Sequence, residues 1–226
     1  MGLQPIYLFA DSRLLFWRNK DGLFLESIRA RMPHTDPRAA YVGASNGDDP
    51  QFYSIFEAAM DGIGIRDCRM ILSSFSPVDQ AFIRDADLIL LAGGDVEKGW
   101  NVFVENGLRE LIVERYAEGT LLIGVSAGAV QLGLFGLAEA EGSFNRLFDA
   151  FKLVPFIIGA HGESEAWKSL RETIHLLEGS ATGIGIPAGG GMVYYPDGAI
   201  EALREPLSEF TARNGTISES LLISKR

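Results

Sequence analysis

The residues best suited to covalent chemistry form the segment Gly124-Val125-Ser126-Ala127-Gly128-Ala129, which joins a predicted strand to a predicted helix. It fits the pattern G-x-S-x-G of the nucleophile elbow, a tight turn that exposes a serine at the carboxyl end of a strand. The helix begins with unpaired N–H groups and the positive end of its dipole, so the Ala127 N–H can hold an oxyanion. The same letters also fit a plain glycine-rich turn in which Ser126 only caps the helix.

A second glycine-rich loop, Ala92-Gly93-Gly94-Asp95, follows the apolar run 88–91. Loops at the carboxyl ends of neighbouring parallel strands line one crevice. Glycines there let the backbone approach a ligand and present N–H groups, so Gly94 is a candidate second oxyanion donor. Asp95 beside it is a candidate substrate-binding residue. The alternative is an ordinary turn that leads into a helix.

A serine nucleophile needs a base, and histidine is the usual one. His161 follows the apolar run 154–160 and therefore comes just after a predicted strand. His175 lies within a predicted helix at 167–177, and His34 lies in a polar loop bounded by prolines. His161 is the candidate base. It comes 35 residues after Ser126, and no histidine follows His175. This order disfavours the α/β-hydrolase fold, in which the histidine comes last and after the acid.

The elements that must position these residues alternate along the chain. Strands are predicted at 6–9, 39–42, 68–72, 88–91 and 121–125, and helices at 51–60, 77–83 and 107–117. Apolar strands that are each followed by a helix indicate a mostly parallel, doubly wound sheet covered on both faces. Further strands are expected at 183–186, 192–195 and 199–203, and Asn214-Gly215 predicts a hairpin between 209–213 and 216–218. We therefore expect a single α/β domain, 1–226, that ends in antiparallel strands.

Composition excludes several classes of function. Of the 226 residues, 47% are hydrophobic and 22% charged, which is typical of a globular protein. The net charge of −10 disfavours nucleic acid or an anionic membrane as a partner. The single cysteine, Cys68, excludes an internal disulfide and a cysteine-based zinc site, and the histidines lack metal-ligand spacing. Residues 120–138 carry no charge, but four glycines favour a strand, a turn and a buried helix over a membrane span.

Three segments together resemble the peptidase E and cyanophycinase family of serine peptidases, peptidase family S51. They are the Gly93-Gly94-Asp95 loop, the GVSAGA elbow and FDAFKLVPFIIGAH, which ends at His161. Their order and spacing are similar to the family's over roughly residues 39–195. The resemblance implies a three-layer α/β/α sandwich like that of class I glutamine amidotransferases. It also implies Ser126 as nucleophile, His161 as general base, and the N–H groups of Gly94 and Ala127 as the oxyanion hole, with no metal or other cofactor.

The chain departs from the family where the third member of the triad is expected. The family has a glutamate that orients the histidine, and the matching position here is Ala188. In serine proteases, loss of the orienting carboxylate lowers turnover by about 10⁴. The candidates to replace it are four other glutamates: Glu163, Glu165, Glu139 and Glu141. Otherwise the pair works as a Ser–His dyad with water, or activity has been lost.

A second departure concerns substrate selection. In the family an arginine holds the aspartate of the substrate, and Glu165 stands at the matching place. A carboxylate repels another carboxylate at neutral pH, so aspartyl specificity is not expected. Lys168 and Arg171 lie about one turn further on and are candidates to bind the substrate instead. The alternative is that both are solvated helix charges.

The sequence thus predicts a cytoplasmic serine hydrolase that cleaves a small peptide or related amide. The runner-up is a catalytically inactive or regulatory small-molecule binding module, which Ala188 favours. A glutamine-dependent amidotransferase needs a cysteine nucleophile, and Cys68 lies inside a predicted strand. The oligomeric state is left open, with a homodimer as one alternative.

Overall fold

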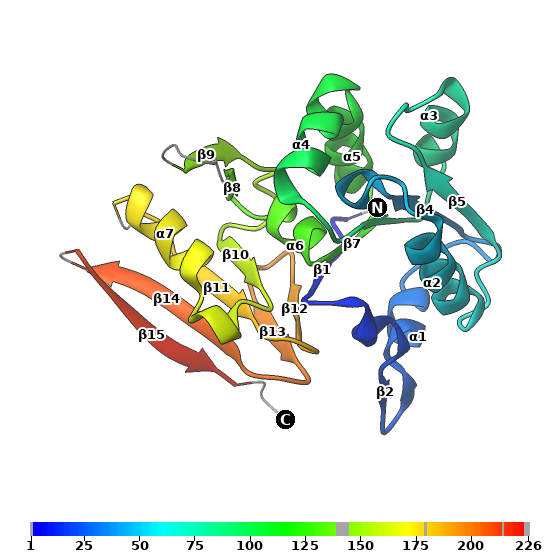
Figure 1. The fold of residues 1–226 in the computed structure, drawn as a ribbon. Helices are drawn as coiled ribbons and strands as arrows, with labels where there is room; N and C mark the ends of the chain where they lie inside the picture. Colours follow the sequence, from blue (N-terminus) through cyan, green and yellow to red (C-terminus); the bar gives the residue numbers. More distant parts are fainter. Residues whose placement is uncertain (1, 139–144, 179, 214, 224–226) are drawn as a thin grey trace.

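A computed structural model of the protein describes residues 2–138, 145–178, 180–213 and 215–223. Its centre is a seven-stranded sheet in the order β13-β12-β1-β7-β6-β4-β5 (Figure 1). Five neighbouring strands, β1, β7, β6, β4 and β5, are parallel. At one edge, β12 pairs antiparallel with β1, and β13 pairs antiparallel with β12. The strands are β1 (Ile6–Phe9), β4 (Arg38–Val42), β5 (Asp67–Ile71), β6 (Leu88–Leu91), β7 (Leu121–Val125), β12 (Gly191–Tyr194) and β13 (Ile200–Leu203).

Side chains alternate across this sheet and build one core on each face. In β1, Ile6 and Leu8 enter one apolar cluster while Tyr7 and Phe9 enter the other. The first cluster is covered by α3 (Pro77–Arg84), α4 (Val96–Glu105), α5 (Leu108–Ala117) and α6 (Ala127–Leu132). The second is covered by the short helix η1 (Ser12–Phe16), α1 (Phe24–Arg29) and α2 (Pro50–Asp61). Because a strand has a period of two, both faces of a parallel sheet can be buried. The three-layer α/β/α fold predicted from the sequence is confirmed.

Local capping fixes where the helices begin. Asp49 accepts a hydrogen bond from the Gln51 N–H at the start of α2, whose first residue is Pro50. Ser76 and Asp79 form a reciprocal capping box at the start of α3. Side-chain oxygens at these positions satisfy N–H groups that the helix itself leaves unpaired.

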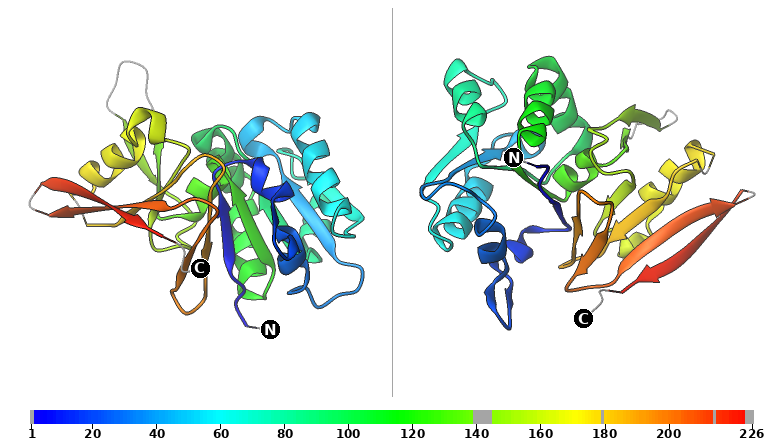
Figure 2. Two further views of the ribbon diagram at one scale, coloured as in Figure 1. Left: turned by 90° about the horizontal axis from the view of Figure 1, so that it is seen from below. Right: turned by 180° about the vertical axis from the view of Figure 1, so that it is seen from behind.

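A second sheet carries the later part of the chain. Its order is β10-β11-β14-β15, with β10 (Ile157–Ala160) parallel to β11 (Gly183–Ile186) and the rest antiparallel. The helix α7 (Lys168–Leu176) packs on it through a small cluster that includes Trp167, Leu170 and Phe210. The pair β14 (Leu207–Arg213) and β15 (Thr216–Leu222) projects away from the seven-stranded sheet (Figure 2). The predicted hairpin is confirmed by this pairing, although Asn214 itself lies outside the described residues.

Several elements were not expected from the sequence. They are α4, α1, the pair β2 (Arg18–Asn19) and β3 (Gly22–Leu23), and the pair β8 (Phe135–Ala138) and β9 (Arg146–Asp149). In the uncharged stretch 120–138, the expected strand and buried helix are β7 and α6, and the stretch ends in β8, which was not expected. In the described parts of the chain, no helix has both the length and the apolar character needed to cross a membrane.

The helix α6 approaches β6 so closely at Gly128 that a substitution there tests this packing. A Cβ added at Gly128 would lie 2.2 Å from the Leu91 carbonyl oxygen, which is backbone and cannot move aside. We predict that Gly128→Ala lowers the free energy of unfolding by at least about 2 kcal/mol, because overpacking a rigid site forces the backbone apart. Chemical denaturation followed by circular dichroism measures the change. Gly2→Ala, where an added Cβ meets nothing within 4 Å, is the matched control and should be neutral.

Candidate active site

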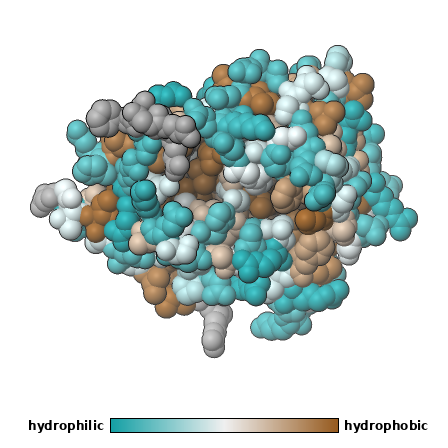
Figure 3. Space-filling view, viewed as in Figure 1, coloured by the Kyte–Doolittle hydropathy of each residue, from teal (hydrophilic) through white to brown (hydrophobic). Residues whose placement is uncertain are grey.

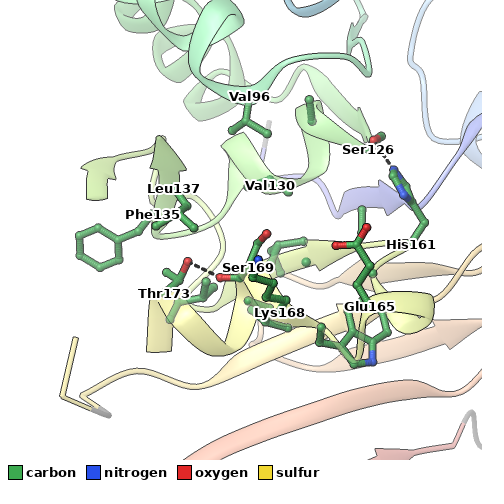
Figure 4. Close-up of a pocket in the computed structure, with 18 of the residues that line it drawn as sticks. Val96, Ser126, Val130, Phe135, Leu137, His161, Glu165, Lys168, Ser169 and Thr173 are labelled. Atoms are coloured by element: carbon green, nitrogen blue, oxygen red, sulfur yellow. Dashed lines mark hydrogen bonds between the residues drawn. The ribbon is translucent and has the colours of Figure 1, made fainter. Parts of the chain in front are cut away.

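Ser126 and His161 come together at the carboxyl end of the seven-stranded sheet. The distance from Ser126 Oγ to His161 Nε2 is 2.7 Å (Figure 4). Ser126 follows β7 and His161 follows β10, so the two sheets each contribute one partner. A serine and a histidine within 2.6–3.2 Å form the nucleophile and base arrangement of acyl-transfer enzymes. The structure brings together the two residues that the sequence singled out.

The backbone of Ser126 is strained, and its side chain does not cap the helix that follows. Its φ of 50° and ψ of −109° are rare for a residue with a side chain. The Ser126 side chain makes no capping hydrogen bond to α6, and its N–H donates to the Phe9 carbonyl oxygen at 2.9 Å. The hydroxyl therefore points towards His161 and is free of the capping role that the alternative interpretation gave it.

His161 is fixed through its main chain. Its N–H donates to the Ile186 carbonyl oxygen at 2.8 Å, which extends the pairing of β10 with β11 by one residue. Its φ of 43° also lies in the left-handed region. Because both partners have positive φ, the surrounding structure must hold each against its local preference.

The loop around Gly94 lies against the 3₁₀ turn η2 (Ala44–Asn46). Gly94 has φ of 135°, and a Cβ there would lie 2.2 Å from the Ser45 carbonyl oxygen, so no other residue fits. The same Ser45 oxygen accepts the Asp95 N–H at 2.8 Å. The Asp95 carboxylate accepts the Lys98 N–H at 2.9 Å and caps α4. Asp95 lines the pocket but also has this structural task.

A buried glutamine joins this loop to the elbow helix. Gln131 of α6 is fully buried and donates to the Val96 carbonyl oxygen at 2.9 Å and to Ser45 Oγ at 3.1 Å. Sequence reasoning missed Gln131, since one glutamine within an apolar helix carries no motif. Buried amides bonded in this way specify one arrangement of the groups they join.

Two main-chain N–H groups of the pocket are unpaired among the described residues. Within the described part of the chain, neither the Gly94 N–H nor the Ala127 N–H has a hydrogen-bond acceptor. Both residues line the same pocket as Ser126 and His161. Unpaired N–H groups beside a nucleophile are the groups that can stabilise an oxyanion.

The third member of the triad is not evident. Among the described residues, no carboxylate forms a hydrogen bond with His161. The Glu163 carboxylate accepts the Ala188 N–H at 2.9 Å, at the position where the glutamate was expected. Glu165 lines the pocket and points into it from η3 (Glu163–Glu165) below His161 (Figure 4). Glu139 and Glu141 lie outside the described residues.

Asp11 is a further carboxylate near the pair, and sequence reasoning missed it. It follows β1, and its carboxylate accepts the Gly189 N–H at 2.7 Å and two hydrogen bonds from the Arg13 side chain. Burial would raise the Asp11 pKa, but the hydrogen bonds from Arg13 and Gly189 outweigh it and lower the pKa below its usual value. Asp11 and Glu163 therefore hold the segment 187–189 from two sides.

Two hollows meet at the Ser126–His161 pair. The larger, of about 490 Å³, lies between α6 and α7 and contains Lys168 and Glu165. The smaller, of about 270 Å³, lies towards η1 and α2. Arg171 lines neither: its guanidinium binds Glu219 at 2.9 Å and lies over the Phe210 ring. The candidate role of Arg171 in substrate binding therefore has no support in this placement.

The remaining candidates lie elsewhere. Cys68 is near the start of the edge strand β5, whereas Ser126 follows the central strand β7. Burial raises the pKa of the Cys68 thiol to about 11. Such a thiol is protonated at neutral pH and is a poor nucleophile. His34 pairs with Asp87, and His175 is exposed on α7. Among the described residues, no group of three His, Cys, Asp or Glu side chains could hold a metal ion.

This chain resembles known proteins in sequence and in structure. The chain is 26% identical over 170 residues to an uncharacterized peptidase of Bacillus subtilis (strain 168), YgaJ, covering 72% of this chain and 70% of the relative. The crystal structure of a peptidase from an acI-B1 Actinobacterium matches with a TM-score of 0.70 at 14% identity, over 99% of this chain and 96% of that one. A putative peptidase E protein from Listeria monocytogenes EGD-e matches with a TM-score of 0.64 at 18% identity, over 90% and 100%.

The family match covers both halves of the site. The family model described as Peptidase family S51 matches residues 18–202, a span that includes the elbow, the Gly94 loop and His161. It accords with the resemblance drawn from the sequence motifs. The chain belongs to peptidase family S51.

Proposed function

We propose that the protein is a serine peptidase in which Ser126 is the nucleophile and His161 the general base. Ser126 Oγ attacks the carbonyl carbon of the scissile amide while His161 Nε2 accepts the hydroxyl proton. His161 then gives this proton to the leaving nitrogen as the C–N bond breaks. Water attacks the resulting ester in the same way, with His161 as base, and releases the acid and the free serine.

The observation that carries the proposal is the 2.7 Å contact between Ser126 Oγ and His161 Nε2. The contact joins residues from two sheets, and each residue keeps a positive φ to make it. Strain of this kind persists only where the surrounding structure enforces it, and it gathers at functional sites. The unpaired N–H groups of Gly94 and Ala127 support the oxyanion hole that the family resemblance implies.

Glu163 is our candidate for the carboxylate that the family places at position 188. Its carboxylate reaches the Ala188 N–H from a residue two positions beyond His161. A negative charge there would favour the imidazolium that forms during attack. Glu165 is the weaker candidate, because it lines the substrate pocket instead.

The proposed substrate is a small peptide without an obligatory aspartate. Glu165 lines the pocket at the place of the family's arginine and would repel a substrate carboxylate. Lys168 lines the same pocket and stays our candidate for binding the substrate. The chain has a single cysteine and so cannot form an internal disulfide. This is typical of proteins in a reducing compartment, so we place the activity in the cytoplasm.

A binding module is the second candidate function. It is favoured by the lack, among described residues, of a carboxylate bonded to His161. In that case the elbow persists as architecture, and the serine is not activated.

We predict that Ser126→Ala abolishes both hydrolysis and labelling. Wild type should react with a fluorophosphonate probe at Ser126 and cleave members of a mixed dipeptide and tripeptide library, as followed by mass spectrometry. Removal of the nucleophile should lower turnover by about 10⁴-fold or more. Ser169→Ala, which removes a hydroxyl from the same pocket, is the control and should label normally. Equal labelling of wild type and Ser126→Ala would support the binding module.

We further predict that Glu163→Gln lowers kcat by at least about tenfold, because the amide keeps an oxygen for the Ala188 N–H but removes the charge. Steady-state kinetics on the best library peptide measures this change. Glu165→Gln should alter KM more than kcat. If Glu163→Gln behaves as wild type while Glu163→Ala is impaired, then Glu163 only anchors the loop and the pair works as a dyad.

A further inference from the structure

The smaller hollow beside the catalytic pair is made largely of apolar groups. It opens onto Ser126 and His161 on the side opposite the larger pocket, between η1 and α2. Leu15, Phe56 and Leu90 form its floor and are almost fully buried. Its volume of about 270 Å³ is enough for one large side chain but is below the usual range for a drug-sized ligand.

An exposed aromatic ring stands in the wall of this hollow. Phe52, in the first turn of α2, is 50% exposed, and Ile55 is half-buried one turn further on. Brown and tan apolar surface is visible over η1 and α2 on the face drawn in Figure 3. A lone exposed apolar residue needs no explanation, but one that continues a buried apolar surface to a nucleophile marks a binding site.

Two polar side chains of the hollow, those of Tyr41 and Asp11, already have hydrogen-bond partners. The Tyr41 hydroxyl accepts a hydrogen bond from Asn46 Nδ2 at 2.7 Å, and burial raises the Tyr41 pKa to about 12, so the ring stays neutral. The Asp11 carboxylate is engaged by Arg13 and by the Gly189 N–H. An anionic ligand side chain would lose its hydration and meet the like charge of the Asp11 carboxylate, so the hollow disfavours it.

The opposite side of the pair differs in character. The larger pocket contains Asp95, Glu97, Glu165 and Lys168. A peptide lying across Ser126 thus meets these four charged side chains, among apolar ones, on one side of the reacting bond. On the other side it meets mainly apolar groups and the carboxylate of Asp11. This asymmetry is what separates substrates by their side chains.

We propose that the apolar hollow lined by Phe52 and Ile55 is a specificity subsite for an aromatic or branched aliphatic side chain next to the scissile bond. The proposal rests on the peptidase activity proposed above and names its substrate class. Phe52 is the specificity-determining residue at the mouth, where its ring covers the bound side chain. The side chain belongs either to the acyl part or to the leaving part of the substrate, and the products of cleavage tell which.

The test compares dipeptides that differ in one side chain. Ala-Ala, Phe-Ala, Ala-Phe, Ser-Ala and Ala-Ser are each incubated with wild type, Phe52→Ala and Val78→Ala. Val78 is 60% exposed on α3 and lines neither hollow, so its variant controls for loss of surface apolar area. We expect wild type to favour one of the two phenylalanine peptides. Phe52→Ala should lower kcat/KM for that peptide by about tenfold and leave Ala-Ala within twofold.

Binding to the Ser126→Ala variant separates this proposal from the catalytic one. The dissociation constants of Phe-Ala, Ala-Phe and Ala-Ala are measured by calorimetry, and the constant for the tighter-binding phenylalanine peptide should rise about tenfold when Phe52→Ala is added. If wild type cleaves nothing but this difference appears, the peptidase proposal fails and the subsite stands. The subsite proposal is overturned if wild type cleaves serine and phenylalanine peptides equally, or if Phe52→Ala weakens cleavage and binding of every peptide alike.

Discussion

The site depends on how closely α6 approaches the ends of β6 and β7. The Gly128 N–H donates to the Ala92 carbonyl oxygen at 3.1 Å, and the space for a Cβ at Gly128 is already filled by Leu91. A helix that begins so near the sheet leaves one residue in which to reverse the chain, and that residue is Ser126. Its positive φ follows from this geometry, and so does the exposure of its hydroxyl. The strain at Ser126 is offset by the well-packed helix and strands on either side of it.

The second sheet positions His161 next to Ser126, which follows a strand of the first sheet. Pairing of β10 with β11 ends where the His161 N–H meets the Ile186 carbonyl oxygen, so the histidine is placed by main-chain bonds rather than by its own side chain. The segment that follows β11 is in turn held by Asp11, which comes from the loop after β1. Hydrogen bonds that a main-chain N–H donates to a carboxylate are among the stronger ones in proteins. The serine, the histidine and the 187–189 segment are thus connected through backbone, which fixes their spacing.

The parts of this site that the sequence could predict are those with local signals. Ser126 was identified by its neighbours Gly124 and Gly128, and the parallel strands by short apolar runs each followed by a helix. Gln131 and Asp11 had no such signal, because their partners are distant in the chain: Gln131 binds Ser45, and Asp11 binds Gly189. The helix α4 was missed because Gly99 and its neighbouring charges weaken the pattern; Gly99 is needed since a Cβ would strike Ser45 Oγ. The second sheet was not separable from the first, because β10 and β11 are four-residue apolar strands like β1 and β6 of the first sheet.

Ala188 stands where the family resemblance predicts a glutamate, and in our proposal Glu163 supplies the charge in its place. A carboxylate at position 188 would come from the loop itself, whereas Glu163 reaches the same backbone from the η3 turn that follows His161. Glu163 in η3 is only two residues after His161 in the chain, so its carboxylate is placed by the turn that follows the histidine and not by the 187–189 loop. That loop is held through its N–H groups, since Ala188 donates to Glu163 and Gly189 donates to Asp11. Loss of a residue from its expected place is therefore not the same as loss of its charge from the site, because the neighbouring turn can reach the same main-chain group.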